Sequence, residues 1–248
     1  MIAVIDYGAG NLRNVCKALE YVHAEIVLTD KPSEIKHANK VVLPGVGAFA
    51  DCMQGLQKRD LLESLKDFAH SGRPFLGICV GMQLLFDVGE EMGDWPGLGL
   101  IPGRVIKFKW AKDREQRAES RERSAVSSQL TAHGVQPSAH SILPSDLARQ
   151  LPVPHNGWNQ VEPCQPNHPI LKDVLPNGYA YFVHSFHAEL ADTSHAVAMS
   201  HYGYAFPAVV AHNNVWGIQF HPEKKPRCGF ADAQKFCSHL KPSVRGLA

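Results

Sequence analysis

The clearest chemical signal in the sequence is a cysteine between two glycines at the end of an apolar segment. The run Gly77-Ile78-Cys79-Val80-Gly81 fits the pattern G-x-nucleophile-x-G, in which a strand turns sharply into a helix. The glycines let the backbone turn tightly and expose the central side chain at the carboxyl edge of a sheet. The amino end of the following helix favours a thiolate. The pattern predicts a nucleophile at Cys79, although a buried structural cysteine fits it as well.

A second segment contains groups that a cysteine nucleophile needs. The motif FHPE (220–223) follows an apolar strand predicted over 215–220, so His221 leaves the sheet at a strand end. The proline restricts the turn, and Glu223 can accept a hydrogen bond from the imidazole. Cys79, His221 and Glu223 are therefore candidates for nucleophile, base and orienting carboxylate. Taken alone, the motif is more typical of an ordinary surface turn.

A third segment offers donors for a developing oxyanion. The run PGVG (44–47) lies between an apolar strand and a helical pattern, so its backbone N–H groups can face the same crevice as Cys79. A plain turn or an anion-binding loop has a similar pattern, but the Lys-Ser/Thr of a P-loop is absent from it. Three such segments at the carboxyl ends of predicted strands favour one acyl-transfer site.

Apolar strands and helices alternate in the part of the chain that must position these groups. Strands are predicted over 2–5, 26–28, 40–43 and 75–78, with helices over 12–22, 32–37 and 48–69. Later strands follow one another closely, over 157–161, 179–186, 196–202, 208–211 and 215–220, before a final helix over 230–240. We expect an α/β fold whose open mixed sheet has a parallel centre and helices on both faces.

The stretch 111–150 differs from the rest of the chain. It has no aromatic residue, it is rich in Arg, Glu and Ser, and its apolar positions follow no period. We expect a flexible, low-order insertion within a single domain that spans 1–248. Its interleaved acidic residues favour a solvated segment over a nucleic-acid contact.

The composition excludes several classes of protein. With 25 Lys and Arg against 24 Asp and Glu, the chain lacks the basic surface that nucleic acid or an anionic membrane requires. No apolar run approaches the roughly 20 residues of a spanning helix, and the amino-terminal segment is unlike a secretion signal. We expect a cytoplasmic protein whose six scattered cysteines are free thiols. No metal site is expected, since no cysteine or carboxylate pair has ligand spacing around His184 and His187.

Taken together, the motifs resemble a known family. PGVGAF, PFLGICVGMQLLF and FHPEK are similar to segments of the class I glutamine amidotransferases, and IDYGAGNL at the start of the chain agrees with them. PHNGWN (154–159) and YFVHSF (181–186) narrow the resemblance to the glutaminase subunits of imidazole glycerol phosphate synthases. The resemblance implies hydrolysis of L-glutamine to glutamate and ammonia without a cofactor. It also implies a heterodimer with a (β/α)8-barrel cyclase, which receives the ammonia and forms imidazole glycerol phosphate in histidine biosynthesis.

The resemblance assigns roles residue by residue. It assigns the triad to Cys79, His221 and Glu223, and the oxyanion donors to the backbone at Val46, Gly47 and Val80. It also implies that the loop at 45–47 needs the cyclase to reach its working state. Contacts with glutamine fall on Gln83, Glu91, His184 and Ser185. Contacts with the cyclase fall on His155, Asn156, Trp158, Asn159 and Lys224.

The sequence departs from the family pattern at three places, and other functions remain open. The departures are the insertion, Phe186 where a tyrosine is common, and Lys-Pro-Arg at 225–227 where Ser-Gln often follows the glutamate. One alternative is the glutaminase subunit of another ammonia-using synthase, against which PHNGWN and YFVHSF argue. Another is a non-catalytic regulatory subunit, against which the intact Cys79, His221 and Glu223 argue.

Overall fold

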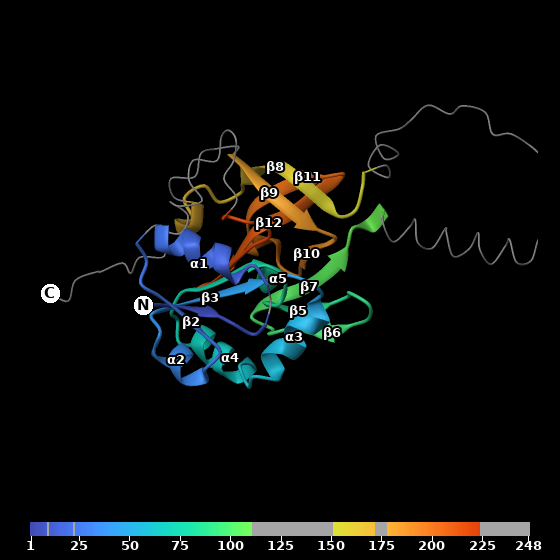
Figure 1. Cartoon of the computed structure of the whole chain (residues 1–248). Helices are drawn as coiled ribbons and strands as arrows, with labels where there is room; N and C mark the ends of the chain where they lie inside the picture. The colour runs from blue at the N-terminus through green and yellow to red at the C-terminus, as the bar shows by residue number, and fades with distance from the viewer. Residues whose placement is uncertain (9, 22, 111–150, 172–177, 224–248) are drawn as a thin grey trace, which may run out of the picture.

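The first part of the chain alternates strands and helices, as the sequence predicts (Figure 1). The computed structural model describes residues 1–8, 10–21, 23–110, 151–171 and 178–223. The insertion expected at 111–150, the helix expected at 230–240, the Lys-Pro-Arg departure at 225–227 and the partner candidate Lys224 lie outside these residues.

Parallel strands form one side of the main sheet. They lie in the order β2-β1-β3-β4, where β1 is Ile2–Ile5, β2 is Ile26–Thr29, β3 is Lys40–Gly45 and β4 is Phe75–Cys79. Helix α1 (Leu12–Tyr21) covers one face of this half (Figure 1). The opposite face is covered by α2 (Pro32–His37), α3 (Phe49–Gln57) and α4 (Leu62–His70). The prediction of helices on both faces of a sheet with a parallel centre is confirmed.

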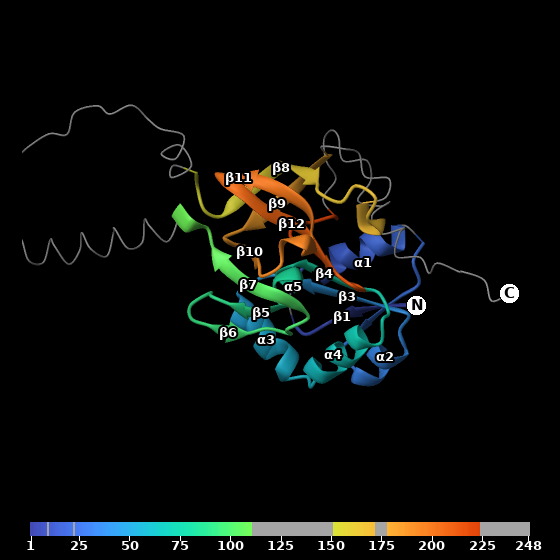
Figure 2. The same cartoon turned by 180° about the vertical axis from the view of Figure 1, so that it is seen from behind.

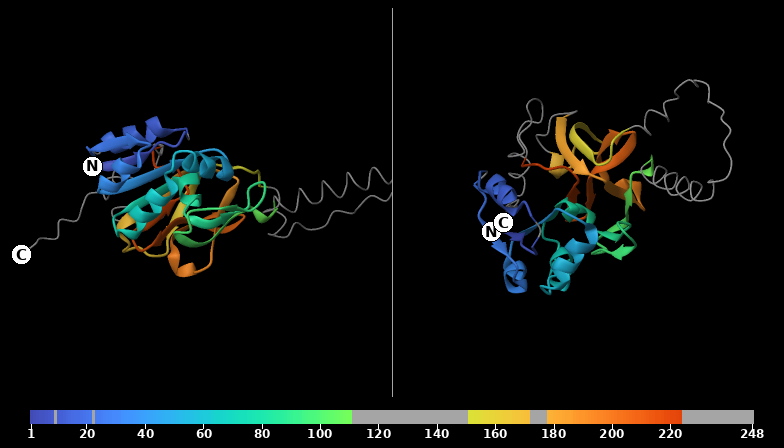
Figure 3. Two further views of the ribbon diagram at one scale, coloured as in Figure 1. Left: turned by 90° about the horizontal axis from the view of Figure 1, so that it is seen from below. Right: turned by 45° about the vertical axis from the view of Figure 1, so that its right-hand side comes forward.

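Antiparallel strands complete the main sheet. Strand β13 (Val215–Ile218) pairs in parallel with β4 and antiparallel with β12 (Tyr204–His212). The sheet continues through β11 (Ala196–Tyr202), β8 (His155–Pro163) and β9 (Gly178–His184) to nine strands. In Figure 3 the blue-to-cyan first part and the orange later strands occupy opposite ends of the molecule. The expected mixed sheet is confirmed.

A second, four-stranded sheet lies beside the main one, and the sequence patterns did not predict it. Its order is β10-β7-β5-β6, with β5 at Phe86–Gly89, β6 at Trp95–Pro96, β7 at Ile101–Lys107 and β10 at Phe186–Leu190 (Figure 2). The strand expected over 179–186 is therefore two strands, since β9 and β10 belong to different sheets. Two short 3-10 helices, Pro169–Leu171 and Thr193–His195, complete the described elements.

The helix expected over 48–69 is also two elements. Helix α3 ends at Gln57 and α4 begins at Leu62, while Asp60 between them has a φ of 54°, in the left-handed region. Both helices bury apolar side chains, including Leu56 and Leu65. The apolar pattern therefore continues across the turn, which explains why periodicity did not reveal it.

The core lies around the central parallel strands. Every residue of β3 and β4 is buried, in agreement with the continuous apolar runs that a sheet covered on both faces requires. Phe49 and Phe68 from the helices and Phe206 and Phe220 from later segments add large buried side chains. Within the described ranges, no helix has the length and apolar character needed to cross a bilayer.

Close backbone packing fixes the turn after β4. A Cβ on Gly81 would overlap the carbonyl oxygen of Leu43, and one on Gly77 would lie 2.5 Å from the carbonyl oxygen of Gly81. Helix α5 (Val80–Gln83) therefore lies directly against β3 and β4. It begins immediately after Cys79, as the glycine pattern predicts.

Gly81→Ala tests this packing. The added methyl group must push backbone away from backbone, so we expect it to lower the free energy of unfolding by about 3 kcal/mol or more. The control is Gly72→Ala, since a Cβ at Gly72 meets nothing within 4 Å and only its φ of 76° opposes the change. That conformational strain costs about 1–2 kcal/mol. Urea unfolding of both variants gives the comparison, and equal losses would contradict the packing argument.

Candidate active site

Cys79 occupies a strained turn at the carboxyl end of β4. Its φ of 55° and ψ of −116° lie in a region that residues with a Cβ rarely adopt. The residue is only 3% exposed, and it lines a pocket of about 470 Å³. The strand-to-helix turn predicted from the two glycines is therefore present, and strain at such a position is typical of functional sites.

His221 and Glu223 form a buried hydrogen-bonded pair at the same edge of the sheet. The register of β13 with β4 pairs Ile218 with Ile78, which brings the segment after β13 beside Cys79. His221 Nδ1 lies 2.8 Å from Glu223 Oε1. The backbone N–H of His221 donates to the carbonyl oxygen of Tyr181, at 2.9 Å. The structure thus brings together the three residues that the motifs selected.

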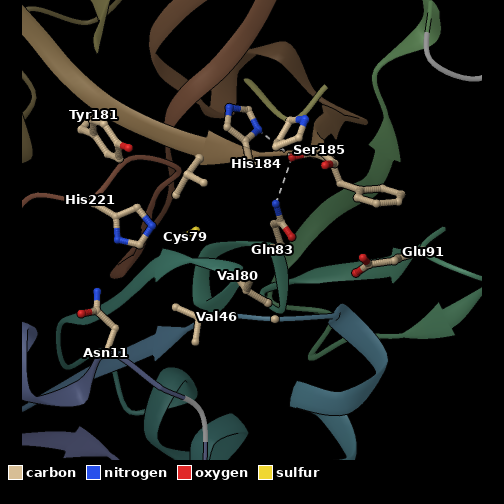
Figure 4. Close-up of a pocket in the computed structure, with 14 residues that line it drawn as sticks. Asn11, Val46, Cys79, Val80, Gln83, Glu91, Tyr181, His184, Ser185 and His221 are labelled. Carbon is tan, nitrogen blue, oxygen red and sulfur yellow. Dashed lines mark hydrogen bonds between the residues drawn. The ribbon is translucent and has the colours of Figure 1, made fainter. Parts of the chain in front are cut away.

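Asn11 supports the pair, and sequence reasoning did not select it. Its Nδ2 donates to Glu223 Oε1 at 2.6 Å, and its side chain lines the pocket (Figure 4). Asn11 has a φ of 68°, which asparagine tolerates better than most residues. A local motif cannot indicate this contact, because it joins residues 212 positions apart.

Electrostatics keep the pair charged around neutral pH. Burial lowers the pKa of His221, but hydrogen bonding and charge interactions with Cys79 and Glu223 outweigh this effect and raise it from 6.5 to about 10. Burial raises the pKa of Glu223, whereas the interactions with His221 and Asn11 bring it below 4.5. No described group makes a regular hydrogen bond to His221 Nε2, which leaves that atom for Cys79.

The signs of these shifts define the pH range of the pair. The raised pKa of His221 stabilises the folded state. This contribution is complete below pH 6.5 and is lost as the pH rises through about 10. A lowered carboxyl pKa gives stabilisation that is present above pH 4.5 and is lost as the pH falls below that value. Both partners are therefore charged across the neutral range.

The pocket beside Cys79 contains most of the other predicted site residues. Its volume lies within the range of small-molecule sites. The predicted residues among its lining are Val46, Gly47, Val80, Gln83, Glu91, His184 and Ser185 (Figure 4). The other lining residues, besides Cys79 and His221, are Asn11, Pro154, Tyr181, Val183 and Phe186. The fold thus gathers residues from both sheets around one cavity.

The candidate oxyanion loop is held by two side chains that do not line the pocket. Tyr7 Oη donates to the carbonyl oxygen of Pro44 at 2.7 Å, and Cys52 Sγ donates to that of Val46 at 3.4 Å. Gly47 has a φ of 94°, which favours glycine. The loop lies next to Cys79, whereas the donor roles of Val46, Gly47 and Val80 remain predictions.

Two predicted substrate residues offer acceptors to the pocket. Gln83 Nε2 donates to the carbonyl oxygen of Phe186 at 3.0 Å and to Gln219 Oε1 at 3.1 Å, so both amide hydrogens are used and Oε1 remains an acceptor. Glu91 Oε2 accepts from the N–H of Phe49 at 2.7 Å, which positions a carboxylate at the pocket. These acceptors suit a ligand that carries an ammonium group.

His184 and His155 have structural surroundings that the motifs did not indicate. His184 Nδ1 lies 2.8 Å from the carbonyl oxygen of Phe186, and its Nε2 lies 3.1 Å from His155 Nδ1. Burial holds the pKa of His184 well below its usual range and lowers that of His155 to about 4. Both ring nitrogens of His184 are thus engaged, so a contact with a ligand would have to use another part of this residue.

The predicted partner residues divide into buried and exposed groups. His155 is 3% exposed and stacks on Phe182 and Tyr202, so its side chain belongs to the interior, and its place at a partner interface stays a prediction. Its strand is the second from the edge of the sheet, and its side chain points inward. Asn159 is half-buried and donates to the carbonyl oxygen of His201 at 2.8 Å.

An exposed face remains on the outer side of these strands. We define the hairpin face as Asn156, Trp158, Tyr179, Tyr181 and Val183, which come from β8 and β9. Trp158 is 39% exposed, Tyr179 45% and Val183 40%. Tyr181 and Val183 also line the pocket, so this apolar face borders the candidate active site.

Metal binding has no support in the described part of the chain. No group of three or more His, Cys, Asp or Glu side chains is arranged there to hold an ion. His187 Nε2 lies 2.6 Å from Tyr204 Oη.

Comparisons with known proteins agree with this geometry. Residues 3–231 match the family model described as glutamine amidotransferase class-I. Imidazole glycerol phosphate synthase subunit HisH of Salinibacter ruber is 40% identical over 238 residues, which cover 96% of this chain and 94% of that protein. The subunit of the same name from Desulfitobacterium hafniense strain DCB-2 is 39% identical over 239 residues, covering 95% and 93%.

Solved structures share the fold at much lower identity. PurLQS from Thermotoga maritima has a TM-score of 0.63 at 17% identity, and the match covers 96% of both chains. The glutaminase domain of Trypanosoma brucei CTPS with bound acivicin has a TM-score of 0.58 at 13% identity, covering 96% of this chain and 92% of that one.

The elbow cysteine, the buried His-Glu pair and the family match together define a class I glutamine amidotransferase. The near full-length similarity then gives the narrower assignment. Within that class, the chain belongs to the family of the HisH subunits of imidazole glycerol phosphate synthase.

His221→Asn tests the coupling between the histidine and the thiol. The raised pKa of His221 keeps a positive charge near Cys79 at neutral pH, and a thiolate is the reactive form of cysteine. We expect the variant to slow alkylation of Cys79 by iodoacetamide at pH 7 by about tenfold or more. Peptide mass spectrometry separates Cys79 from the other cysteines, and an unchanged rate at pH 7 would refute the coupling.

Proposed function

We propose that this protein is the glutaminase subunit of an imidazole glycerol phosphate synthase. It hydrolyses L-glutamine to glutamate and ammonia, and it passes the ammonia to a cyclase subunit in histidine biosynthesis. The observation that carries the proposal is the His221–Glu223 pair beside Cys79 in a pocket, within a chain 40% identical to a HisH subunit. No cofactor is required for this reaction.

The proposed reaction proceeds through a thioester. The Cys79 thiolate attacks the side-chain amide carbon of glutamine, and backbone N–H groups at Val46, Gly47 and Val80 stabilise the oxyanion. Protonated His221 gives its proton to the departing ammonia, which leaves a glutamyl thioester on Cys79. Neutral His221 then removes a proton from water, and the resulting hydroxide releases glutamate. Cleavage of the thioester frees the Cys79 thiolate, and the imidazole already carries the proton taken from water, so the Cys79–His221 pair is restored.

Glutamine is held by charge and by hydrogen bonds at its amino-acid end. We assign the ammonium group to the carboxylate of Glu91 and to Oε1 of Gln83, since both face the pocket as acceptors. Ser185 also lines the pocket and can donate through its hydroxyl group. His184 contributes through its backbone, because its ring nitrogens are engaged with Phe186 and His155.

The partner surface is assigned to the hairpin face. This face is apolar, exposed and adjacent to the pocket, so a cyclase barrel bound there would receive ammonia at a short distance from Cys79. The bond from His221 N–H to the Tyr181 carbonyl oxygen also links β9 to the triad. We place the heterodimer in the cytoplasm, which agrees with the free thiols of Cys16, Cys52, Cys79 and Cys164.

Cys79→Ala tests the reaction. Without the thiol no thioester forms, so we expect loss of glutamine-dependent synthesis by the complex by about 10³-fold or more. Synthesis from added ammonia should continue at the parent rate, since the cyclase site is intact. Both assays use the variant with its cyclase, monitored by product formation. Glutamine turnover by the variant would exclude Cys79 as the nucleophile, and full turnover by the parent chain without a cyclase would contradict the need for the partner.

Trp158→Ala tests the partner surface. An exposed tryptophan at the centre of an interface often contributes most of its binding energy, so we expect the dissociation constant of the complex to rise about tenfold or more. The matched control is Leu28→Ala on β2, which removes an apolar side chain that is 48% exposed at the other edge of the sheet. Calorimetric titration of each variant with the cyclase measures the two dissociation constants. Equal affinities for the Trp158 variant and the parent would place the interface elsewhere.

A further inference from the structure

A chain of side-chain amides joins the wall of the pocket to the nucleophile. It runs from the carbonyl oxygen of Phe186 through Gln83 and Gln219 to the sulfur of Cys79. Neither the motifs nor the mechanism above uses Gln219. Its side chain does not line the pocket, and it has no exposed surface at all.

The sheet register explains why Gln219 lies beside Cys79. Strands β13 and β4 run in parallel with Ile218 opposite Ile78, so the next residue of each strand lies at the same level. The backbone N–H of Gln219 donates to the carbonyl oxygen of Ala208 at 2.9 Å, which ties this segment to β12. A long polar side chain is thereby held within a core where every polar atom needs a partner.

Gln83 fixes the orientation of the Gln219 amide. Gln83 Nε2 lies between two acceptors, the carbonyl oxygen of Phe186 at 3.0 Å and Gln219 Oε1 at 3.1 Å. The carbonyl oxygen of Phe186 can only accept, so the nitrogen of Gln83 must face it. The same nitrogen then requires an oxygen from Gln219. The Nε2 of Gln219 is consequently turned to Cys79 Sγ, at 3.9 Å.

We propose that Gln219 is a positioning residue for the glutaminase reaction, holding the Cys79 sulfur through an N–H group that Gln83 orients. This inference rests on the proposed function of the site. The N–H contact is long while the sulfur is a thiol, and it strengthens when the sulfur carries a negative charge. Gln219 thus assists His221 by stabilising the thiolate from another element and by limiting the directions in which the sulfur can point.

The location of the contact suits this role. Cys79 is held in a strained backbone conformation and is nearly buried, so a charged sulfur has little access to water there. A charge in such surroundings is stable only when donors or counter-charges face it. His221 provides the counter-charge, and Gln219 provides an uncharged donor that does not exchange its proton during the reaction.

Gln219→Met tests the proposal, since methionine has a similar length but no N–H donor. In the full chain with its cyclase, we expect kcat for glutamine hydrolysis to fall about tenfold or more, while KM changes by less than about threefold. Iodoacetamide alkylation of Cys79 in the full chain should slow by about threefold to tenfold at pH 7. Gln219→Glu, which replaces the donor with an acceptor, should slow both reactions further.

Gln165→Met is the matched control. Gln165 Nε2 donates to the carbonyl oxygens of Ser194 and Ala196, both at 2.8 Å, in an exposed and a part-buried contact, and it lies in the segment that follows β8. We expect this variant to lose some thermal stability and to keep the parent kcat and alkylation rate. If the role of Gln219 were purely structural, Gln219→Met would likewise lose some thermal stability and keep the parent kcat and alkylation rate.

The outcomes separate the possible failures. A folded Gln219→Met variant with the parent kcat and the parent alkylation rate would overturn the proposal. If that variant does not fold, Gln83→Met releases the Gln219 amide, and the parent alkylation rate in this second variant would overturn the proposal equally. Alkylation does not depend on glutamine binding, so the substrate role of Gln83 does not affect the result. A parent complex without glutaminase activity would instead contradict the proposed function.

Discussion

The contact between the backbones of β3, β4 and α5 determines the rest of this site. Gly77 and Gly81 allow the turn after β4 to lie against Leu43 without a side chain between them. Cys79 is thereby forced into its unusual backbone conformation, with its sulfur at the pocket. The same contact brings the PGVG segment at the end of β3 beside Cys79. A strained turn of this kind persists because the packed strands around it leave no alternative.

The second determinant is the position of β13 between the parallel and antiparallel parts of the sheet. Its carboxyl end delivers Gln219, His221 and Glu223 to Cys79 from one continuous segment. The antiparallel strands then connect this segment to the surface, because His221 N–H is bonded to Tyr181 of β9. This hydrogen bond therefore links the charged His221–Glu223 pair directly to Tyr181 of the apolar hairpin face.

Sequence patterns predicted the parallel strands, α1, α2 and the triad because these depend on local periodicity and on strand-end motifs. They could not predict Asn11 on Glu223 or Gln219 on Cys79, since these contacts join residues far apart in the chain. The second sheet was missed because β5 and β6 are short and are defined by pairing with distant segments. The burial of His155 could not be predicted for a related reason, since a motif does not show which face of its strand is buried.

The central claim is that Cys79 is the nucleophile in a glutamine-specific pocket. The most direct measurement is covalent labelling of the complex by an electrophilic diazoketone analogue of glutamine, followed by peptide mass spectrometry. The account predicts one label per chain on Cys79, prevented by excess L-glutamine. Labelling of a different cysteine, or labelling that L-glutamine does not reduce, would contradict it.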